Sequence, residues 1–413
     1  RLFGAAGFVL AAPRAPVKSN AWKLISYNDW NKKNSFHIKL GNLFMTFLDP
    51  SKPVILYGSN ISYFTGKMEN YFKIKEIPYE LKSVKYPKFE KKMKKKVGIH
   101  QMPAVELPDG RWMTDSTKMI QWFESQIQKN SLLPKDPLQA FICFLLEDWA
   151  DEWWWRPAMH YRWHYSEGAN FASRHLAEEL LNEIPVPLWI KKIYFTRRQR
   201  NGYTTGDGIT KENVEQVEEN FLSLLRNLEV VFNNRPFLFG NRPSIADIGL
   251  SGPFFRHFAL DPVPLEIIRQ EAPYVLKWVS TLWSTKISKC DENYIDGIPS
   301  DLEPLLKEIG NTYLPYLCAN VDAVNSKKNN FDFKTEEIFF KKARFSQYRV
   351  WCLDELRKNF DSIPKEDSSA CKQKLIEFGC WEPLWRNENL PLLDNQEAEL
   401  PFKANRKMLG VNE

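Results

Sequence analysis

The sequence has few cysteines and no long apolar segment. Its six cysteines are scattered and form no C-x-x-C pair, so they are too sparse for a disulfide framework, a pattern typical of a reducing compartment. The longest apolar run covers residues 2–12, whereas a helix that spans a membrane needs roughly 18 apolar residues. We therefore expect no transmembrane segment.

An excess of charge of one sign is missing as well. The chain carries 57 Lys and Arg against 51 Asp and Glu, and a net charge of +6 on 413 residues does not indicate a nucleic-acid partner. Eight lysines gather between Lys82 and Lys96, but aromatic residues are not interleaved among them as a base-stacking platform requires. The cluster fits a solvated helix and loop. It also fits attraction of an anionic ligand, an acidic partner or a membrane surface.

Aromatic residues, in contrast, are abundant. The chain has 28 Phe, 15 Tyr and 15 Trp, and its hydrophobic fraction is 43%. A chain with so much apolar surface to bury does not belong to the intrinsically disordered class. Its length predicts two or three domains.

The N-terminal segment is basic and poor in acids. Residues 1–48 carry seven Lys and Arg and a single acid, Asp29. This composition resembles the end of an organellar transit segment, which favours a mitochondrial location. The alternative is a plain N-terminal arm over residues 1–50 of a cytoplasmic protein, whose aromatic side chains pack on the rest of the chain or on a neighbouring subunit.

Residues 51–132 predict an α/β domain. Two short apolar runs, Pro53–Tyr57 and Pro78–Val84, flank a stretch with helical spacing over residues 61–72, which predicts a right-handed βαβ unit. Two further short strands follow on either side of a tight turn at residues 107–112, and a helix begins after Asp115 and Ser116. The element order is therefore βαβ and then ββα.

Residues 137–285 predict an all-α domain. Phe141–Trp163 is a strongly aromatic helical segment, and Glu212–Phe232 is an amphipathic helix with acids in its first turn. Ser244 and Asp247 have the spacing of a capping box at the start of a buried helix. The remaining residues, 286–413, predict a mostly helical extension with one small hairpin near residues 331–340 and no recognisable catalytic motif.

Several of these motifs together resemble the glutathione S-transferases. Leu56–Phe64 (LYGSNISYF), Met102–Val105 (MPAV) and Thr114–Ser116 (TDS) resemble their glutathione-binding domain, and residues 235–248 resemble the hallmark of their helical domain. Residues 344–357 resemble the tail of a long subgroup with a C-terminal extension. The resemblance implies a thioredoxin-like N-terminal domain, an all-α transferase domain and a mostly helical extension that covers either the dimer face or the ligand cleft.

The resemblance also implies a glutathione site. In the family, the proline at the position of Pro103 is cis, and the main chain of the preceding residue, here Met102, pairs with the cysteinyl part of glutathione. Asp115 would meet the amino group, while the Ser116 hydroxyl and the N–H groups of the following helix would receive the γ-glutamyl carboxylate. The alternative interpretation of Ser116 is a helix N-cap without a ligand.

Ser62 takes the place of the family's catalytic residue. A Ser hydroxyl there would donate a hydrogen bond to the glutathione thiolate, which is the nucleophile. The proline that usually follows is replaced by Tyr63, so an ordinary turn or N-cap serine is the alternative. No cysteine lies nearby, which argues against a glutaredoxin-like exchanger.

Trp154, His160 and Tyr161 are candidates for the wall of the acceptor-substrate pocket, because the family forms that pocket beside its first long helix. The alternative is aromatic packing in the core. His160 and His164 lie four residues apart near two acids, but a zinc site needs three or four fixed ligands, so we expect no metal.

The sequence thus supports two functions from different classes. The first is a transferase-like protein that binds glutathione as a substrate and conjugates it to an apolar electrophile. The second is a catalytically inactive structural subunit with the transferase fold, held in a larger, mitochondrial complex. The expected partners are glutathione and either a second copy, through the transferase domains, or other proteins.

Overall fold

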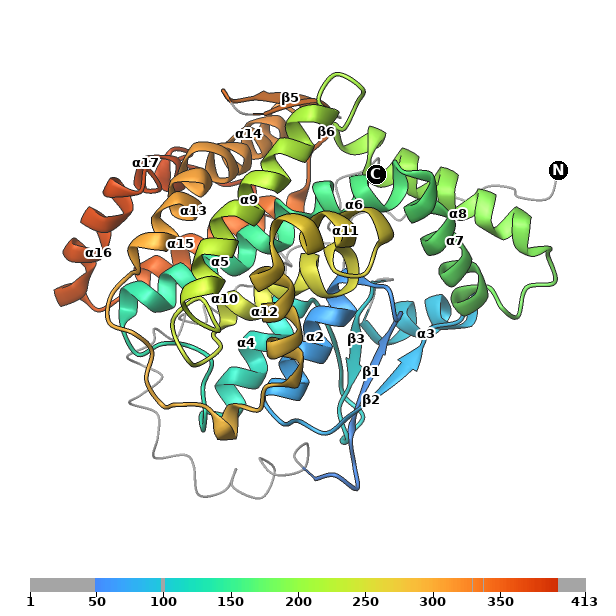
Figure 1. Ribbon diagram of the computed structural model, residues 1–413, viewed down its shortest axis with the longest axis horizontal. Helices are drawn as coiled ribbons and strands as arrows, with labels where there is room; N and C mark the ends of the chain where they lie inside the picture. The colour runs from blue at the N-terminus through green and yellow to red at the C-terminus, as the bar shows by residue number, and fades with distance from the viewer. Residues whose placement is uncertain (1–48, 98–100, 329, 337, 393–413) are drawn as a thin grey trace, which may run out of the picture.

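The computed structural model describes residues 49–97, 101–328, 330–336 and 338–392. The expected contacts of the basic arm, residues 1–48, lie outside the described residues. Figure 1 shows the sheet and the C-terminal extension at opposite sides of the molecule, with the long helices between them. The strands and helices are β1 (Val54–Gly58), α2 (Tyr63–Ile74), β2 (Tyr79–Ser83), α3 (Lys88–Val97), β3 (Ala104–Glu106), β4 (Trp112–Thr114), α4 (Ser116–Gln126), α5 (Pro137–Glu152), α6 (Trp155–Trp163), α7 (Ser166–Leu180), α8 (Leu188–Tyr203), α9 (Val214–Asn234), α10 (Ile245–Pro253), α11 (Pro262–Glu271), α12 (Pro273–Ser284), α13 (Glu303–Glu308), α14 (Leu314–Asn325), β5 (Asn330–Lys334), β6 (Phe339–Arg344), α15 (Gln347–Asp361), α16 (Lys365–Glu377) and α17 (Trp381–Trp385).

The N-terminal sheet has the strand order β2-β1-β3-β4. β1 pairs parallel with β2 and antiparallel with β3, as the βαβ and ββα order predicts. Neighbouring residues of a strand face opposite sides of the sheet. Val105 and Met113 therefore pack with α2 and α4, whereas Ala104 and Trp112 pack with α3 on the other face. The two helical layers and the sheet confirm a thioredoxin-like domain.

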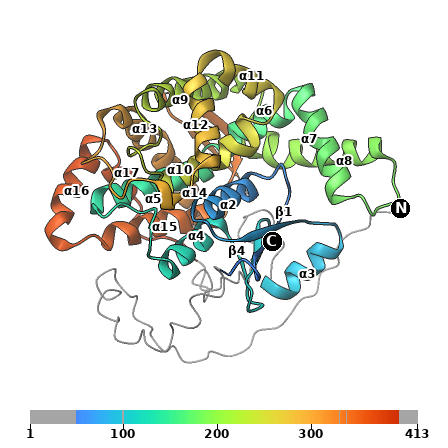
Figure 2. The ribbon, with the colours of Figure 1, turned by 60° about the horizontal axis from the view of Figure 1, so that its bottom comes forward.

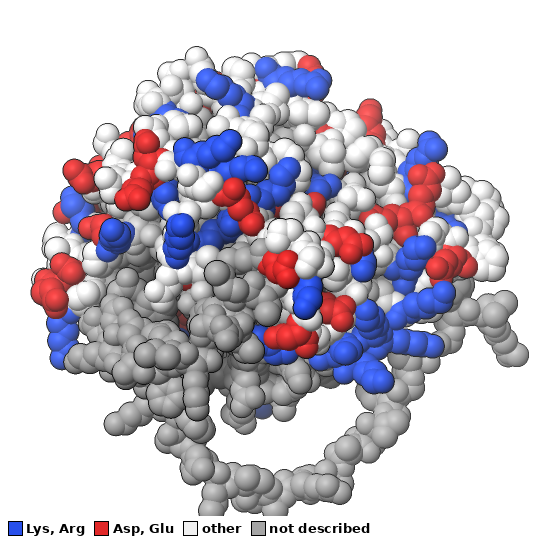
Figure 3. Space-filling view, turned by 90° about the horizontal axis from the view of Figure 1, so that it is seen from below, with Lys and Arg blue, Asp and Glu red and all other residues white. Residues whose placement is uncertain are grey.

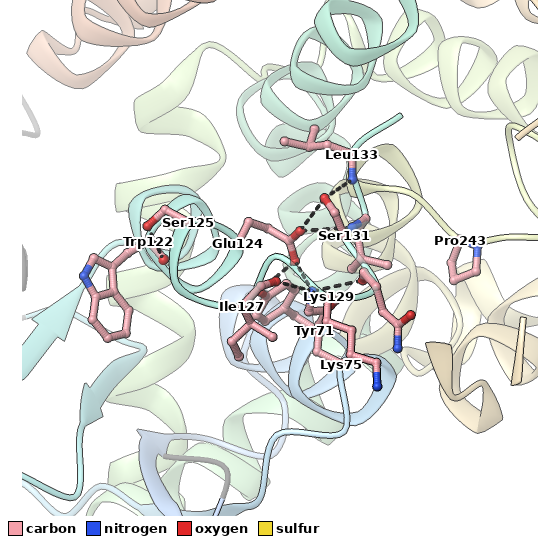
Figure 4. Close-up of polar contacts among 12 residues, drawn as sticks. Tyr71, Lys75, Trp122, Glu124, Ser125, Ile127, Lys129, Ser131, Leu133 and Pro243 are labelled. Atoms are coloured by element: carbon pink, nitrogen blue, oxygen red, sulfur yellow. Dashed lines mark hydrogen bonds and ion pairs between the residues drawn. The ribbon is translucent and has the colours of Figure 1, made fainter. Parts of the chain in front are cut away.

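A buried ion pair fastens the turn that leaves this domain (Figure 4). The Lys75 ammonium at the end of α2 lies 3.0 Å from a carboxylate oxygen of Glu124 in α4. It also donates to the main-chain oxygens of Ile127 and Asn130, at 3.2 and 3.0 Å. Lys75 thereby satisfies carbonyl groups that the end of α4 leaves unpaired, and it fixes the direction in which the chain enters the helical domain.

The helical domain is built around α5 and α10, which pack closely against each other. The Ser244–Asp247 capping box is confirmed, since each residue accepts a hydrogen bond from the main chain of the other. The aromatic segment, expected as one helix, is divided into α5 and α6 at Trp153 and Trp154. Both tryptophans are buried, so the break carries their rings into the core of the helical domain.

The extension packs on the helical domain (Figure 2). Its helix α15 lies against α5, and the expected hairpin is confirmed as the antiparallel pair β5–β6. The first part of the extension is helical as expected, since α13 continues through a π-helical turn into α14. All six cysteine thiols are free. Among the described residues, no helix is long and apolar enough to cross a membrane.

Candidate functional site

One edge of the sheet collects the three segments on which the expected glutathione site depends. Tyr57 near the end of β1 is paired with Ala104 at the start of β3, and Ala104 is paired with Thr114 at the end of β4. The Thr114 hydroxyl donates to the main-chain oxygen of Pro103 at 2.9 Å. The loop after β1, the Met102–Pro103 turn and the Asp115–Ser116 turn therefore meet at this edge.

The loop before Ser62 is held from the helical domain. The buried Arg162 guanidinium of α6 donates to the Ile61 main-chain oxygen at 2.6 Å, and a carboxylate oxygen of Asp261 lies 2.8 Å from the same guanidinium. Glu179 of α7 accepts from the Ser59 hydroxyl at 2.6 Å. Contacts between domains, in addition to the local sequence, thus place Ser62.

Ser62 is the N-cap of α2. Its hydroxyl oxygen accepts from the Thr65 N–H at 3.5 Å, and its side chain is partly exposed. A capping oxygen leaves the hydroxyl hydrogen available for donation, and Ser62 Oγ donates to no described residue. The N-cap interpretation and a donor role for Ser62 are therefore compatible.

The Met102–Pro103 peptide bond is cis, as the resemblance implies. Pro103 is buried at the start of β3, whereas Met102 is partly exposed. Within the described residues, the Met102 main chain makes no backbone hydrogen bond, so both of its polar groups are free.

Asp115 has a strained backbone and caps α4. Its φ of +75° and ψ of 109° are rarely adopted by a residue with a side chain. Its carboxylate accepts from the Lys118 N–H at 3.2 Å, so Asp115, and not Ser116, is the N-cap. The interpretation of Ser116 as an N-cap is wrong. Ser116 is the first residue of α4 and is buried, and no hydrogen bond joins its hydroxyl to another described residue.

The extension reaches this turn. The Tyr348 hydroxyl of α15 lies near enough to Asp115 to affect its pKa, and the Lys118 ammonium lies 2.6 Å from the Glu355 carboxylate. Asp115 and Ser116 are only 3% and 6% exposed. Burial raises the pKa of Asp115 to about 6, although the Lys118 N–H and the nearby Tyr348 hydroxyl favour its charged form. A carboxyl group with this pKa changes its charge near neutral pH.

A buried charge cluster lies one turn further along α2. The Lys67 ammonium is fully buried and pairs with the carboxylates of Glu147 and Asp151 on α5. Thr117 of α4 donates to the same Glu147 carboxylate at 2.7 Å. Burial opposes the charge of Lys67, but the carboxylates of Asp151 and Glu147 outweigh it and raise the pKa of Lys67. The cluster joins α2, α4 and α5 behind the candidate site.

The residues expected to line the acceptor-substrate pocket lie in the helical domain and not at the sheet edge. Trp154, His160 and Tyr161 are at most 1% exposed and pack within the helical domain. His160 pairs with a Glu218 carboxylate oxygen at 2.8 Å. These side chains offer no accessible surface to a substrate in this structure, which agrees with the core-packing alternative.

Phe64, two residues after Ser62, contacts an aromatic residue of α6. The rings of Phe64 and Trp155 stack with centroids 5.6 Å apart, and both side chains are partly exposed. The described residues contain no group of three or more His, Cys, Asp or Glu that could hold a metal ion.

Sequence reasoning missed the parts of the site that come from distant segments. Lys67 occupies an apolar position of α2, between Tyr63 and Tyr71 at four-residue spacing, and Glu147 and Asp151 interrupt an otherwise aromatic helix. Charges inside apolar stripes were therefore a usable signal for this cluster. No pattern in the sequence indicates that Tyr348 meets Asp115.

Two sequence families match the chain. Residues 56–131 match the family described as glutathione S-transferase, N-terminal domain, and residues 190–285 match the family described as glutathione S-transferase, C-terminal domain. Among curated proteins, none matches the chain.

Several solved structures resemble the chain at low sequence identity. A beta-etherase from Sphingobium is 20% identical, with a TM-score of 0.41 over 57% of this chain and 97% of its own. A transferase-like protein from Pseudomonas syringae is 16% identical, with a TM-score of 0.39 over 63% of this chain and 74% of its own. A transferase from Methylobacterium radiotolerans, in complex with glutathione sulfonate, is 16% identical, with a TM-score of 0.33 over 60% of this chain and 98% of its own.

Proposed function

Because this chain belongs to the glutathione S-transferase-like family, with both of its domains and a C-terminal extension, we propose that it binds glutathione at the sheet edge and conjugates it to an apolar electrophile. The peptide would be bound by Met102, Pro103, Asp115 and Ser116. The Ser62 hydroxyl would donate a hydrogen bond to the glutathione thiolate.

The observation that carries the proposal is the strained turn at Asp115. Strained residues persist where the surrounding structure enforces them, and they concentrate at binding and catalytic sites. Because Asp115 caps α4 through the Lys118 N–H, the N–H groups of Ser116 and Thr117 and the Ser116 hydroxyl remain for a ligand. Free N–H groups at a helix N-terminus favour an anion such as the γ-glutamyl carboxylate.

The remaining groups suit the rest of the peptide. The free main-chain groups of Met102 can pair with the cysteinyl residue, which would direct its sulfur toward the N-terminus of α2. There, the Ser62 hydroxyl and the positive end of the helix dipole would stabilise the thiolate over the thiol. The thiolate would then attack the electrophile, whose apolar part would meet Phe64 and Trp155.

A structural function is the second candidate, and it is supported by the cover that the extension forms over the start of α4. The contact of α15 with α4 leaves Asp115 and Ser116 little exposed surface. Such a cover favours the structural subunit of a larger, mitochondrial complex, in which the extension has replaced the ligand and the fold serves protein partners, including a second copy.

Calorimetry on the full chain separates the two functions. If the proposal holds, glutathione binds, Cys-Gly, which lacks the γ-glutamyl group, does not, and Ser116→Ala weakens the binding. The absence of any heat with glutathione would contradict the proposal and leave the structural function.

The catalytic part has its own test. Ser62→Ala should leave the affinity for glutathione nearly unchanged and lower the conjugation rate roughly 10- to 150-fold, because one hydrogen bond to the thiolate contributes about 1.5–3 kcal/mol. Thr65→Ala, in the same helical turn, is the control. An unchanged rate in Ser62→Ala would assign the chemistry to another group.

A further inference from the structure

Helix α8 exposes an unusual number of apolar side chains. Of its 16 residues, only Phe195 is buried. Five of its side chains are among the ten large apolar residues that are exposed in the described part of the chain. They are Leu188, Trp189, Ile190, Ile193 and Tyr194. The largest exposed fractions are 63% for Trp189 and 53% for Tyr194, which is far beyond the occasional exposed residue of a soluble surface.

The helix is nevertheless firmly anchored. Phe195 is buried in the same apolar cluster as Phe89 and Met93 of α3 and the alanines of α7. Trp189, Ile190, Ile193 and Tyr194 occupy successive turns on the side of the helix away from Phe195. Figures 1 and 2 both show α8 at the periphery of the molecule. The exposed apolar side therefore belongs to a fixed helix.

Free cations accompany this apolar row. Arg197 and Arg198 are exposed one turn further along α8, and Lys91 and Lys95 are exposed on α3. Among the described residues, none of these four side chains has a carboxylate within ion-pair distance. Lys88 of α3 lies 2.7 Å from Glu183 in the loop between α7 and α8, and apolar residues of α3 and α8 belong to one buried cluster. Figure 3 shows Lys and Arg side chains gathered at its lower right, on the side where α3 lies.

We propose that this α8 face, formed by residues 188–198 and the neighbouring lysines of α3, docks on the surface of a membrane that contains anionic lipids. Trp and Tyr are the side chains that prefer the level of the lipid headgroups, and the leucine and isoleucines would enter the adjacent acyl region. The arginines and lysines would pair with lipid phosphates and carboxylates. This inference is independent of glutathione binding.

The charge distinguishes the lipid from other occupants. A symmetric contact between two copies would place two apolar rows together, each surrounded by cations of the same sign, so the copies would repel each other. An anionic membrane supplies both an apolar layer and a continuous negative surface. No helix among the described residues can cross the membrane, so the contact would be peripheral.

Co-sedimentation with vesicles tests the proposal. The full chain should sediment with vesicles of phosphatidylcholine and phosphatidylserine, much less with phosphatidylcholine alone, and less as salt is raised. Trp189→Ser combined with Tyr194→Ser should lower the binding at least tenfold. The matched control, Val230→Ser with Tyr274→Ser, changes exposed apolar residues elsewhere and should bind like the original chain.

The charge contribution is tested in the same assay. Arg197→Glu with Arg198→Glu should lower binding to the anionic vesicles at least tenfold. Arg226→Glu with Arg269→Glu changes the net charge equally at other exposed sites and should have a much smaller effect. Hydrogen exchange on the unaltered chain avoids any folding defect that a substitution could cause. Adding anionic vesicles should slow exchange in residues 188–198.

Three results would overturn the proposal. The first is no binding to anionic vesicles. The second is equal binding by the control and α8 variants without protection of α8. The third is a dimer or a complex with an acidic protein that the α8 changes abolish, while the vesicles leave α8 unprotected.

Discussion

Replacing Lys67 tests how the two domains are held together. Lys67→Met keeps the length of the side chain and removes its charge, so the change is electrostatic and leaves no large cavity. The carboxylates of Glu147 and Asp151 would then lie buried without a cation. Breaking a buried pair in this way costs about 3–5 kcal/mol of the free energy of unfolding. This is a large part of the roughly 5–15 kcal/mol typical of a folded chain.

The loss of unfolding free energy in Lys67→Met should become larger as pH rises. Burial raises the pKa of Asp151 well above its usual value, and the charge of Lys67 acts against this rise. Without Lys67, the two carboxyl groups would retain about one more proton in the folded state. Where the folded state binds more protons, stability falls as pH rises. The difference between variant and original chain should therefore grow by about 1.4 kcal/mol per pH unit, or about 3 kcal/mol from pH 5 to pH 7.

Urea unfolding at several pH values, followed by circular dichroism, measures this difference. Lys73→Met, on the same helix but partly exposed, should cost less than about 1 kcal/mol at every pH, since among the described residues it loses a cation–π contact with Trp283 and the attraction of Glu69. Combining Lys67→Met with Glu147→Gln and Asp151→Asn should remove the extra pH dependence. A loss that is independent of pH, or smaller than about 1 kcal/mol, would refute the reasoning.

Three further predictions concern single side chains. Asp247→Ala leaves the donors of its capping box unpaired and should lower the free energy of unfolding by on the order of 3 kcal/mol, as measured by urea unfolding. Lys75→Met leaves main-chain oxygens and the Glu124 carboxylate unpaired and should cost about 3 kcal/mol, with faster hydrogen exchange at the end of α4. Affinity for glutathione should rise with pH through about 6 as Asp115 ionises; in Tyr348→Phe, which lacks the hydroxyl that favours the charged carboxylate, calorimetry should find this rise at higher pH. An unshifted profile would mean that Asp115 does not meet the ligand's amino group.

The local elements of the fold follow from the sequence because their causes are local. The capping box depends on Ser244 and Asp247, three residues apart, and each satisfies the main chain of the other. The βαβ order depends on short apolar runs separated by a helical stripe. Even so, the break between α5 and α6 was not predicted, because aromatic residues continue through Trp153 and Trp154 and neither position is a Gly or Pro that would signal a bend.

Some site residues could be found from short motifs, whereas the surroundings of others depend on tertiary packing. Met102–Pro103 and Asp115–Ser116 are short motifs, and the sheet pairing brings them together as their strand order requires. The burial of Trp154, His160 and Tyr161 depends on which sides of α6 meet other helices, and an aromatic composition does not distinguish a pocket wall from a core.

The sequence by itself determined the strand order of the N-terminal domain, the helices with a clear apolar period, the Ser244–Asp247 capping box and the family, since hydrogen bonds and apolar periodicity act over a few residues. Only the tertiary structure decided that Tyr348 and Glu355 lie at the start of α4, more than two hundred positions from Asp115 and Lys118. Contacts of this kind depend on the shape and charge of two finished surfaces. For the same reason, only the folded chain reveals that α8 keeps its tryptophan and tyrosine outside the core.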